Sequence, residues 1–135
     1  MTRLKVVPLI FLLGLCSTAY ADAIREGSLN AKSTASGVYV WWYSSDESNV
    51  TRFEVWRSSA ATNQWVKIAD RTPKGNGSYY DFDDETAFRL TDSFYQYRVR
   101  TVFSDRPSVD SPPVGVMHNT NSVRRTWGSI KAMFR

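Results

Sequence analysis

The chain has 135 residues, 42% of them hydrophobic and 14% aromatic, which is enough apolar material for the core of one domain. It has a single histidine, so a multi-histidine metal site is excluded. The formal net charge of +4 does not indicate a nucleic-acid-binding protein, because the basic excess lies in the first few and the last dozen residues.

The N-terminal segment has the three-part layout of a secretory signal peptide. Arg3 and Lys5 precede an apolar run from Val6 to Leu15, and Ala19-Tyr20-Ala21 forms a small-x-small cleavage site. The apolar run is about half the length that a membrane-spanning helix needs. We therefore expect cleavage near Ala21 and a secreted or periplasmic product.

Cys16 leaves a second outcome open. The run Leu13-Gly14-Leu15-Cys16 resembles the lipid-attachment site of a bacterial lipoprotein, although that family has a small residue before the cysteine and Leu15 is large. Cleavage after Ala21 would instead leave a product without cysteine. A domain of this kind must fold on its apolar core alone, without disulfides.

The middle of the chain has the period-two pattern of short strands. From Gly37 to Tyr43, Val38, Val40 and Trp42 alternate with Tyr39, Trp41 and Tyr43. Further strands are expected at Phe53–Ser58, Trp65–Ala69, Tyr79–Asp83, Tyr95–Val102 and Val114–Met117, with a weaker first strand around Ser28–Lys32. The pattern predicts an all-β, seven-stranded antiparallel sandwich of two sheets.

The order of these motifs resembles the fibronectin type III family, which has an immunoglobulin-like fold. The resemblance covers Ser28–Met117 and rests on Trp42, Phe53-Glu54-Val55, Trp65, Leu90 and Tyr95-Gln96-Tyr97-Arg98-Val99. It implies that Trp42 and Leu90 are structural, and that the Tyr95 hydroxyl bonds the backbone of the preceding loop. Leu90 lies one residue closer to Tyr95 than is usual in that family.

The sequence thus divides into four parts: a signal peptide (1–21), an N-terminal linker (22–27), a fibronectin type III-like domain (28–117) and a basic amphipathic tail (118–135). In the tail, Val123, Trp127, Ile130 and Phe134 follow helical spacing, with Arg124, Arg125, Lys131 and Arg135 on the polar side. Three roles remain open for this C-terminal helix: docking on its own domain, contact with a membrane surface or assembly partner, or service as a sorting signal.

Two surfaces are candidate binding sites. Tyr39, Trp41 and Tyr43 should point away from the core, where they would stack on sugar rings, bury against a partner protein or be covered by neighbouring segments. The second surface combines Trp56 with Arg98 and Arg100, which the family topology places on adjacent strands. Cross-strand contacts of the arginines with Glu54 and Trp56 would instead make this second surface a self-contained solvent-facing set of residues.

The sequence contains few residues that could bind a metal or catalyse a reaction. Asp81, Asp83, Asp84 and Glu85 form an acidic cluster that would suit calcium, but they lack the spacing of a known calcium loop and are otherwise a solvated strand end. Nothing near His118 indicates an oxyanion hole, and no cofactor motif is present. We therefore expect a non-catalytic binding or structural module with a protein partner, or alternatively a carbohydrate-binding accessory domain that uses its aromatic strand face.

Overall fold

The structure is a computed structural model that describes residues 21–89 and 94–118. Its elements in chain order are β1 (Asn30–Thr34), β2 (Gly37–Tyr43), β3 (Val50–Ser59), β4 (Trp65–Arg71), β5 (Tyr79–Asp84), the 3-10 helix η1 (Glu85–Arg89), β6 (Phe94–Phe103), β7 (Val109–Asp110) and β8 (Val114–Met117). Leu90 and the expected C-terminal helix lie outside the described residues. Within the described ranges, no helix has the length and apolar character needed to cross a membrane.

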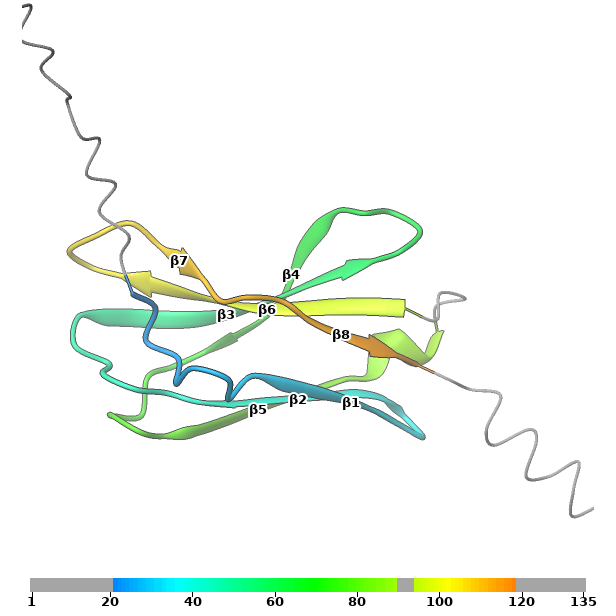
Figure 1. The fold of residues 1–135 in the computed structure, drawn as a ribbon, viewed down its shortest axis with the longest axis horizontal. Helices are drawn as coiled ribbons and strands as arrows, with labels where there is room; N and C mark the ends of the chain where they lie inside the picture. The colour runs from blue at the N-terminus through cyan, green and yellow to red at the C-terminus, as the bar shows by residue number, and fades with distance from the viewer. Residues whose placement is uncertain (1–20, 90–93, 119–135) are drawn as a thin grey trace, which may run out of the picture.

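The strands form two antiparallel sheets that lie one above the other (Figure 1). One sheet has the order β1-β2-β5. The other has the order β4-β3-β6-β7, with β8 also paired to β6. The central pairing of β3 with β6 runs from Val50↔Phe103 to Ser59↔Tyr95, as the family topology implies. The fold is therefore all-β and antiparallel, as the alternating pattern predicted.

Eight strands are present in the described ranges instead of the seven expected, because the last expected strand is preceded by a second short one. Both β7 and β8 pair with β6, and Ser111-Pro112-Pro113 separates them. Proline has no N–H to donate to a ladder, so the pairing is interrupted there. Ser111 bridges the break, since its backbone N–H donates to the Val99 carbonyl and its hydroxyl accepts from the Val99 N–H.

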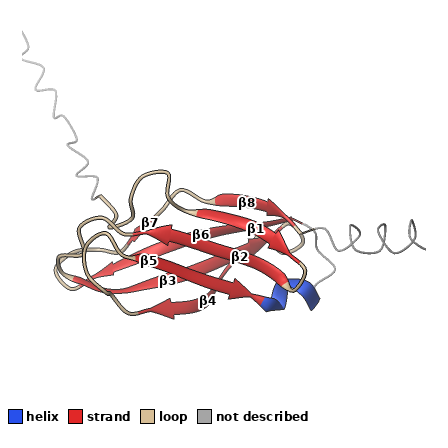
Figure 2. Cartoon of the chain, turned by 90° about the horizontal axis from the view of Figure 1, so that it is seen from below, coloured by secondary structure: helices blue, strands red, loops and turns tan. Residues whose placement is uncertain are grey.

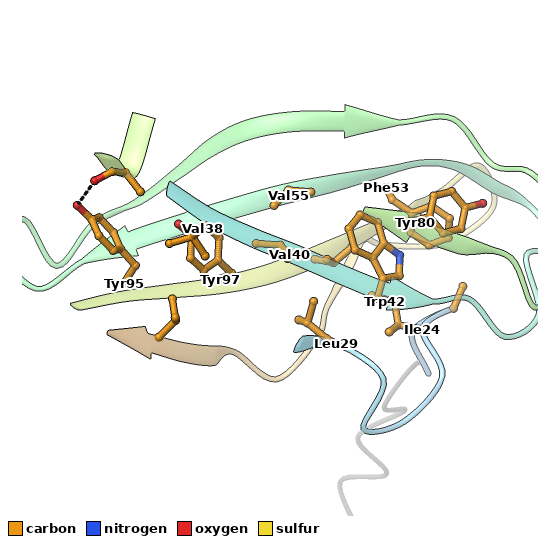
Figure 3. Close-up of a cluster of buried hydrophobic side chains, with 14 of the residues drawn as sticks. Ile24, Leu29, Val38, Val40, Trp42, Phe53, Val55, Tyr80, Tyr95 and Tyr97 are labelled. Atoms are coloured by element: carbon orange, nitrogen blue, oxygen red, sulfur yellow. Dashed lines mark hydrogen bonds between the residues drawn. The ribbon is translucent and has the colours of Figure 1, made fainter. Parts of the chain in front are cut away.

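The core lies between the two sheets and is rich in aromatic rings (Figure 3). Val38, Val40 and Trp42 are fully buried, which confirms the predicted inward face of β2. Trp42 stacks on Tyr80 of β5 with ring centroids 5.3 Å apart, and Phe53 of β3 meets both rings. These large rings bury enough apolar surface to hold two sheets together without a crosslink.

Tyr95 makes the hydrogen bond that the resemblance implied. Its hydroxyl donates to the carbonyl of Ala87 in η1 at 3.4 Å (Figure 3). Both residues are fully buried. The bond fixes the short 3-10 segment against the start of β6, although no helical periodicity had indicated that segment.

Residues 22–27, expected to be a linker, instead belong to the fold. Ala23 is 2% exposed and Ile24 is 7% exposed, and Ile24 forms a β-bridge with Ser44. The Ala23 carbonyl accepts from the Ser45 N–H, and the Ala23 N–H lies 3.4 Å from the Thr101 hydroxyl. Two apolar residues are too few to show periodicity in the sequence, so the pattern did not indicate that Ala23 and Ile24 pack against the sheets.

Candidate functional site

The exposed side of the three-stranded sheet carries four aromatic rings, Tyr39, Trp41, Tyr43 and Tyr79, which we call the outer aromatic face. Three of them come from β2, where they alternate with the buried residues, and Tyr79 is the cross-strand partner of Tyr43 on β5. Tyr39 and Trp41 are half-buried, while Tyr43 is 39% and Tyr79 is 38% exposed. The aromatic side chains of β2 that were predicted to point away from the core therefore do so.

The four rings form two pairs. Tyr39 and Trp41 stack with centroids 5.5 Å apart and an interplanar angle of 24°. Tyr43 and Tyr79 lie 5.2 Å apart with their planes tilted by 59°. Within the first pair each ring covers one face of the other, so the rings do not form one flat, coplanar platform.

Cationic side chains lie over these rings. The Lys32 ammonium on β1 is 5.7 Å from the Tyr39 centroid and 5.9 Å from that of Trp41. The Arg25 guanidinium is 5.1 Å from the Tyr43 ring. All three distances fall within the range of a cation–π contact. The β1 side of the face is therefore basic.

The β5 side of the face is acidic. The Tyr39 hydroxyl donates to Asp81 at 2.9 Å and lies 2.6 Å from the Tyr79 hydroxyl, within hydrogen-bond distance. The hydrogen bond with Tyr79, then desolvation, and then the hydrogen bond with Asp81 raise the pKa of Tyr39 above its ordinary value. Asp83 is exposed two residues further along the same face.

Trp56, Arg98 and Arg100 lie on the outer side of the other sheet and are not brought together with the outer aromatic face. The Arg100 guanidinium is 4.4 Å from the Trp56 ring, and that of Arg98 is 4.2 Å from Trp65. Asp110 binds both arginines, at 2.7 Å to Arg100 Nε and 3.6 Å to an Arg98 nitrogen, and its hydrogen bond raises the pKa of Arg100. These contacts lie within the domain, although Arg98 Nε is buried without a hydrogen-bond partner among the described residues. The sequence indicated the Arg–Trp contact but not the roles of Trp65 and Asp110.

The acidic cluster does not assemble into a calcium site. Asp81 and Asp83 point to the outer side of β5, whereas Asp84, by the same alternation, points inward and binds Arg57 at 2.7 Å. Glu85 begins η1. Among residues 21–89 and 94–118, no group of three or more histidine, cysteine, aspartate or glutamate side chains is arranged to hold a metal ion.

His118 was expected among polar residues beyond the last strand, and it follows β8 directly. The residue is 4% exposed, and Nδ1 lies 2.7 Å from the Ser33 hydroxyl of β1. The contact joins the end of β8 to β1 across the open side of the two sheets. A buried ring in this position is a structural contact between strands.

An open groove of about 570 Å³ lies where the N-terminal segment meets the prolines between β7 and β8. Its walls include Ile24, Leu29, Pro112, Pro113 and Val114, with Asp22, Arg25 and Glu26 at the polar positions. Sequence reasoning missed this groove, because its two walls lie far apart in the chain.

The tail residues that the sequence singled out, Trp127, Ile130, Lys131, Phe134 and Arg135, lie outside the described residues.

No family model and no curated protein matches the chain. Among solved structures it is similar to the pectate lyase PelI from Erwinia chrysanthemi, with 27% identity over 65% of this chain and 26% of that chain and a TM-score of 0.48. The pectate lyase Pel3 from Pectobacterium carotovorum is 24% identical over 64% of this chain and 25% of its own, with a TM-score of 0.46. The chain spans about a quarter of the length of these structures. The TM-scores are too low for these matches to indicate the fold or the function of the chain.

Proposed function

We propose that this chain is an exported, non-catalytic module of the fibronectin type III kind, which binds a protein partner through its outer aromatic face. The observation that carries the proposal is the set of four partly exposed rings on one sheet face, with cations on one side and carboxylates on the other. Tyrosine and tryptophan are enriched in the centres of protein interfaces, where they are the commonest energetic hot spots.

The strand order supports the family part of the proposal. Sheets of order β1-β2-β5 and β4-β3-β6 correspond to the two sheets of an immunoglobulin-like sandwich, and Tyr95 bonds backbone upstream of it, as in a tyrosine corner. The fold alone names no activity, so the functional part of the proposal depends on the face. The leader pattern before Ala21 supports export.

The ring geometry favours a protein partner over a sugar. A sugar ring binds by lying flat on an exposed aromatic face. In the Tyr39–Trp41 pair each ring covers a face of the other, and Lys32 is near both rings, so mainly the ring edges and the Tyr39 hydroxyl are presented. Edges, hydroxyls and charges of both signs suit the mixed polar and apolar surface of a protein.

Site-specific photocrosslinking tests the proposal. A photoreactive phenylalanine analogue at position 41 should capture a defined protein from the native extracytoplasmic fraction. The same analogue at the exposed Val66 of β4, on the other sheet, is the matched control and should not capture it. Tyr43→Ala should weaken binding of the captured protein at least tenfold, since a hot-spot residue contributes about 2 kcal/mol.

Two results would contradict the proposal. The first is equal capture from positions 41 and 66, which would mean that the face has no selectivity. The second is binding to a glycan array that is lost in Tyr43→Ala, which would assign the face to carbohydrate.

A further inference from the structure

The two flanks of the outer aromatic face carry opposite charges, so the face is complementary to a copy of itself. We infer that the protein partner of this face is a second copy of the chain, packed face to face about a two-fold axis that runs along β2. The inference rests on the proposed function, because it names the partner of the same site. It fails alone if the face binds a different protein.

Strand pairing arranges the face as three rows, with β2 between β1 and β5 (Figure 2). Lys32 of β1 is the cross-strand partner of Tyr39, which is in turn the partner of Asp83 of β5. Residues that are opposed in this way point to the same side of a sheet. The cation and the carboxylate therefore lie at one level of the face, on opposite sides of the aromatic row.

Neither of these two charges is neutralised within the described part of the chain. Lys32 and Asp83 are exposed, and no ion pair joins either of them to another described residue. Their strands are separated by β2, so the two backbones are about 10 Å apart. Both charges are therefore available to an oppositely charged group of a partner.

A two-fold axis along β2 brings these opposite charges together. It turns the second copy over, so that β1 of one copy lies above β5 of the other and the two β2 strands lie above each other. Lys32 of each copy then faces Asp83 of the other, and the contact occurs twice. A two-fold axis across the strands would place β1 above β1, with like charges opposed on each flank. The charges therefore select the axis along β2.

The other levels of the face also match in this arrangement. At the level next to the charged pair, Asn30 of one copy faces Asp81 of the other, and an amide can donate a hydrogen bond to a carboxylate. At the level of Tyr43, the Arg25 guanidinium, which lies 5.1 Å from that ring, faces Tyr79 of the other copy. A guanidinium over an aromatic ring gives a second cation–π contact.

The aromatic rows form the centre of the interface. Each ring of β2 faces the same ring of the other copy, in sheets that pack about 10 Å apart with their strands nearly aligned. The face is three strands wide and seven residues long, which is roughly 14 by 23 Å in each copy. This footprint is well below the roughly 800 Å² per partner of a standard interface. The dimer should therefore be weak and reversible, and the chain monomeric when dilute.

Mixing two charge-reversed variants tests the dimer in sedimentation equilibrium over a concentration series. Lys32→Glu opposes two carboxylates, and Asp83→Lys opposes two cations, so each variant alone should associate at least tenfold more weakly than the wild type. In an equimolar mixture, the two mutated positions face each other, and so do the two native charges. Both contacts are then attractive, and the mixture should associate as the wild type does.

Matched controls separate this contact from effects of net charge and folding. Lys67→Glu makes the same change of charge on β4 of the other sheet, and it should associate as the wild type does. The melting temperatures of the Lys32 and Asp83 variants should stay close to that of the wild type, because both side chains are exposed. The photoreactive analogue at position 41 should crosslink the purified chain to itself.

Three results would overturn the inference: a wild type that stays monomeric at every concentration, a Lys32→Glu variant that associates as strongly as the wild type, or a mixture that associates no better than its separate components. Crosslinking from position 41 in the native extracytoplasmic fraction then decides the proposed function. Capture of a different protein retains that function and rejects only the second copy as its partner. Capture of no protein rejects both.

Discussion

Arg57 of β3 and Asp84 of β5 join the two sheets by an ion pair of 2.7 Å in the interior of the domain. The Asp84 side chain is only 1% exposed, and the carboxylate also accepts from the hydroxyls of Tyr97 and Thr86, at 2.6 Å each. Burial by itself would raise the pKa of Asp84, but the hydrogen bonds from Thr86, Tyr97 and Arg57 outweigh burial and hold the pKa below its ordinary value of 3.8. The carboxylate is therefore ionised in the folded domain.

Removing the cation from this pair should destabilise the domain strongly. Arg57→Met leaves Asp84 buried without its countercharge, and we expect a loss of roughly 3 kcal/mol or more in the free energy of unfolding, measured by urea titration at pH 7. Arg52→Met is the control, because Arg52 is exposed and its partner Glu54 keeps its contacts with Lys67 and Trp56. It should cost less than about 1 kcal/mol, and equal losses in the two variants would show that burial of the pair is unimportant.

The same carboxylate predicts loss of stability in acid. Because the folded pKa of Asp84 is lowered, its contribution is fully present above about pH 4 and is lost as the pH falls through the folded value. Asp84→Asn should be less stable than the wild type at pH 7, and the difference should shrink towards pH 2. A difference that stays constant over this range would contradict the assignment.

A hydrogen bond between Tyr80 of β5 and Glu47 of the β2–β3 loop predicts the opposite pH dependence. The Tyr80 hydroxyl donates to the buried Glu47 at 2.5 Å, while Glu47 also accepts from the Gly75 N–H at 2.7 Å. Burial, and then the bond to Glu47, raises the pKa of Tyr80 from 10.0 to about 12. The contribution of Tyr80 is therefore present below pH 10 and lost as the pH rises through 12. The stability difference between wild type and Tyr80→Phe should be about 1–3 kcal/mol at pH 8 and should decrease by pH 11.

Gly37 should tolerate no side chain. Its φ is +155°, and a Cβ at this position would collide with the backbone carbonyl of Asp84. Since that carbonyl belongs to a paired strand, it cannot move cheaply, and Gly37→Ala should cost several times the loss in Gly27→Ala. Gly27 has a φ of +71° but nothing within 4 Å, so its replacement costs only about 1–2 kcal/mol of backbone strain. Similar melting temperatures for the two variants would argue against the close approach of Gly37 to the Asp84 carbonyl.

The free edge of β5 is closed by basic side chains from the preceding segment. Lys74 Nζ donates to the Tyr79 carbonyl at 2.9 Å, and Arg71 Nε donates to the Asp81 carbonyl at 3.0 Å. Open strand edges promote pairing between molecules, and charged caps suppress it. The double variant Arg71→Met, Lys74→Met should associate in a concentration-dependent way in sedimentation velocity. The control variant Lys67→Met on β4 should leave the association state unchanged. A double variant that remains monomeric would show that the edge is protected in another way.

The alternating pattern predicted most of the strands because it reflects a local property of extended backbone. The inward Trp42 and the outward Tyr39, Trp41 and Tyr43 follow from the spacing alone. The candidate site was therefore half predictable: the β2 rings could be seen in the sequence, but Tyr79, Lys32 and Arg25 join them only through strand pairing.

Features that depend on long-range partners could not be predicted. The acidic cluster looked like one group in the sequence, yet alternation separates Asp84 from Asp81 and Asp83. The pairing of Arg57 with Asp84 joins positions that the alternating pattern does not relate. Likewise, Ala23 and Ile24 become part of the core only because Ser44 and Ser45 lie beside them.

The burial of Ala23 bears on when the predicted leader could be cleaved. If a peptidase cuts after Ala21, as the leader pattern predicts, it must hold several residues on both sides of the bond in an extended form. Ala23 and Ile24 are packed into the folded domain, so the native state withholds them from such an enzyme. Cleavage of the leader would therefore have to precede folding of the domain. A precursor that folded before cleavage would keep its leader.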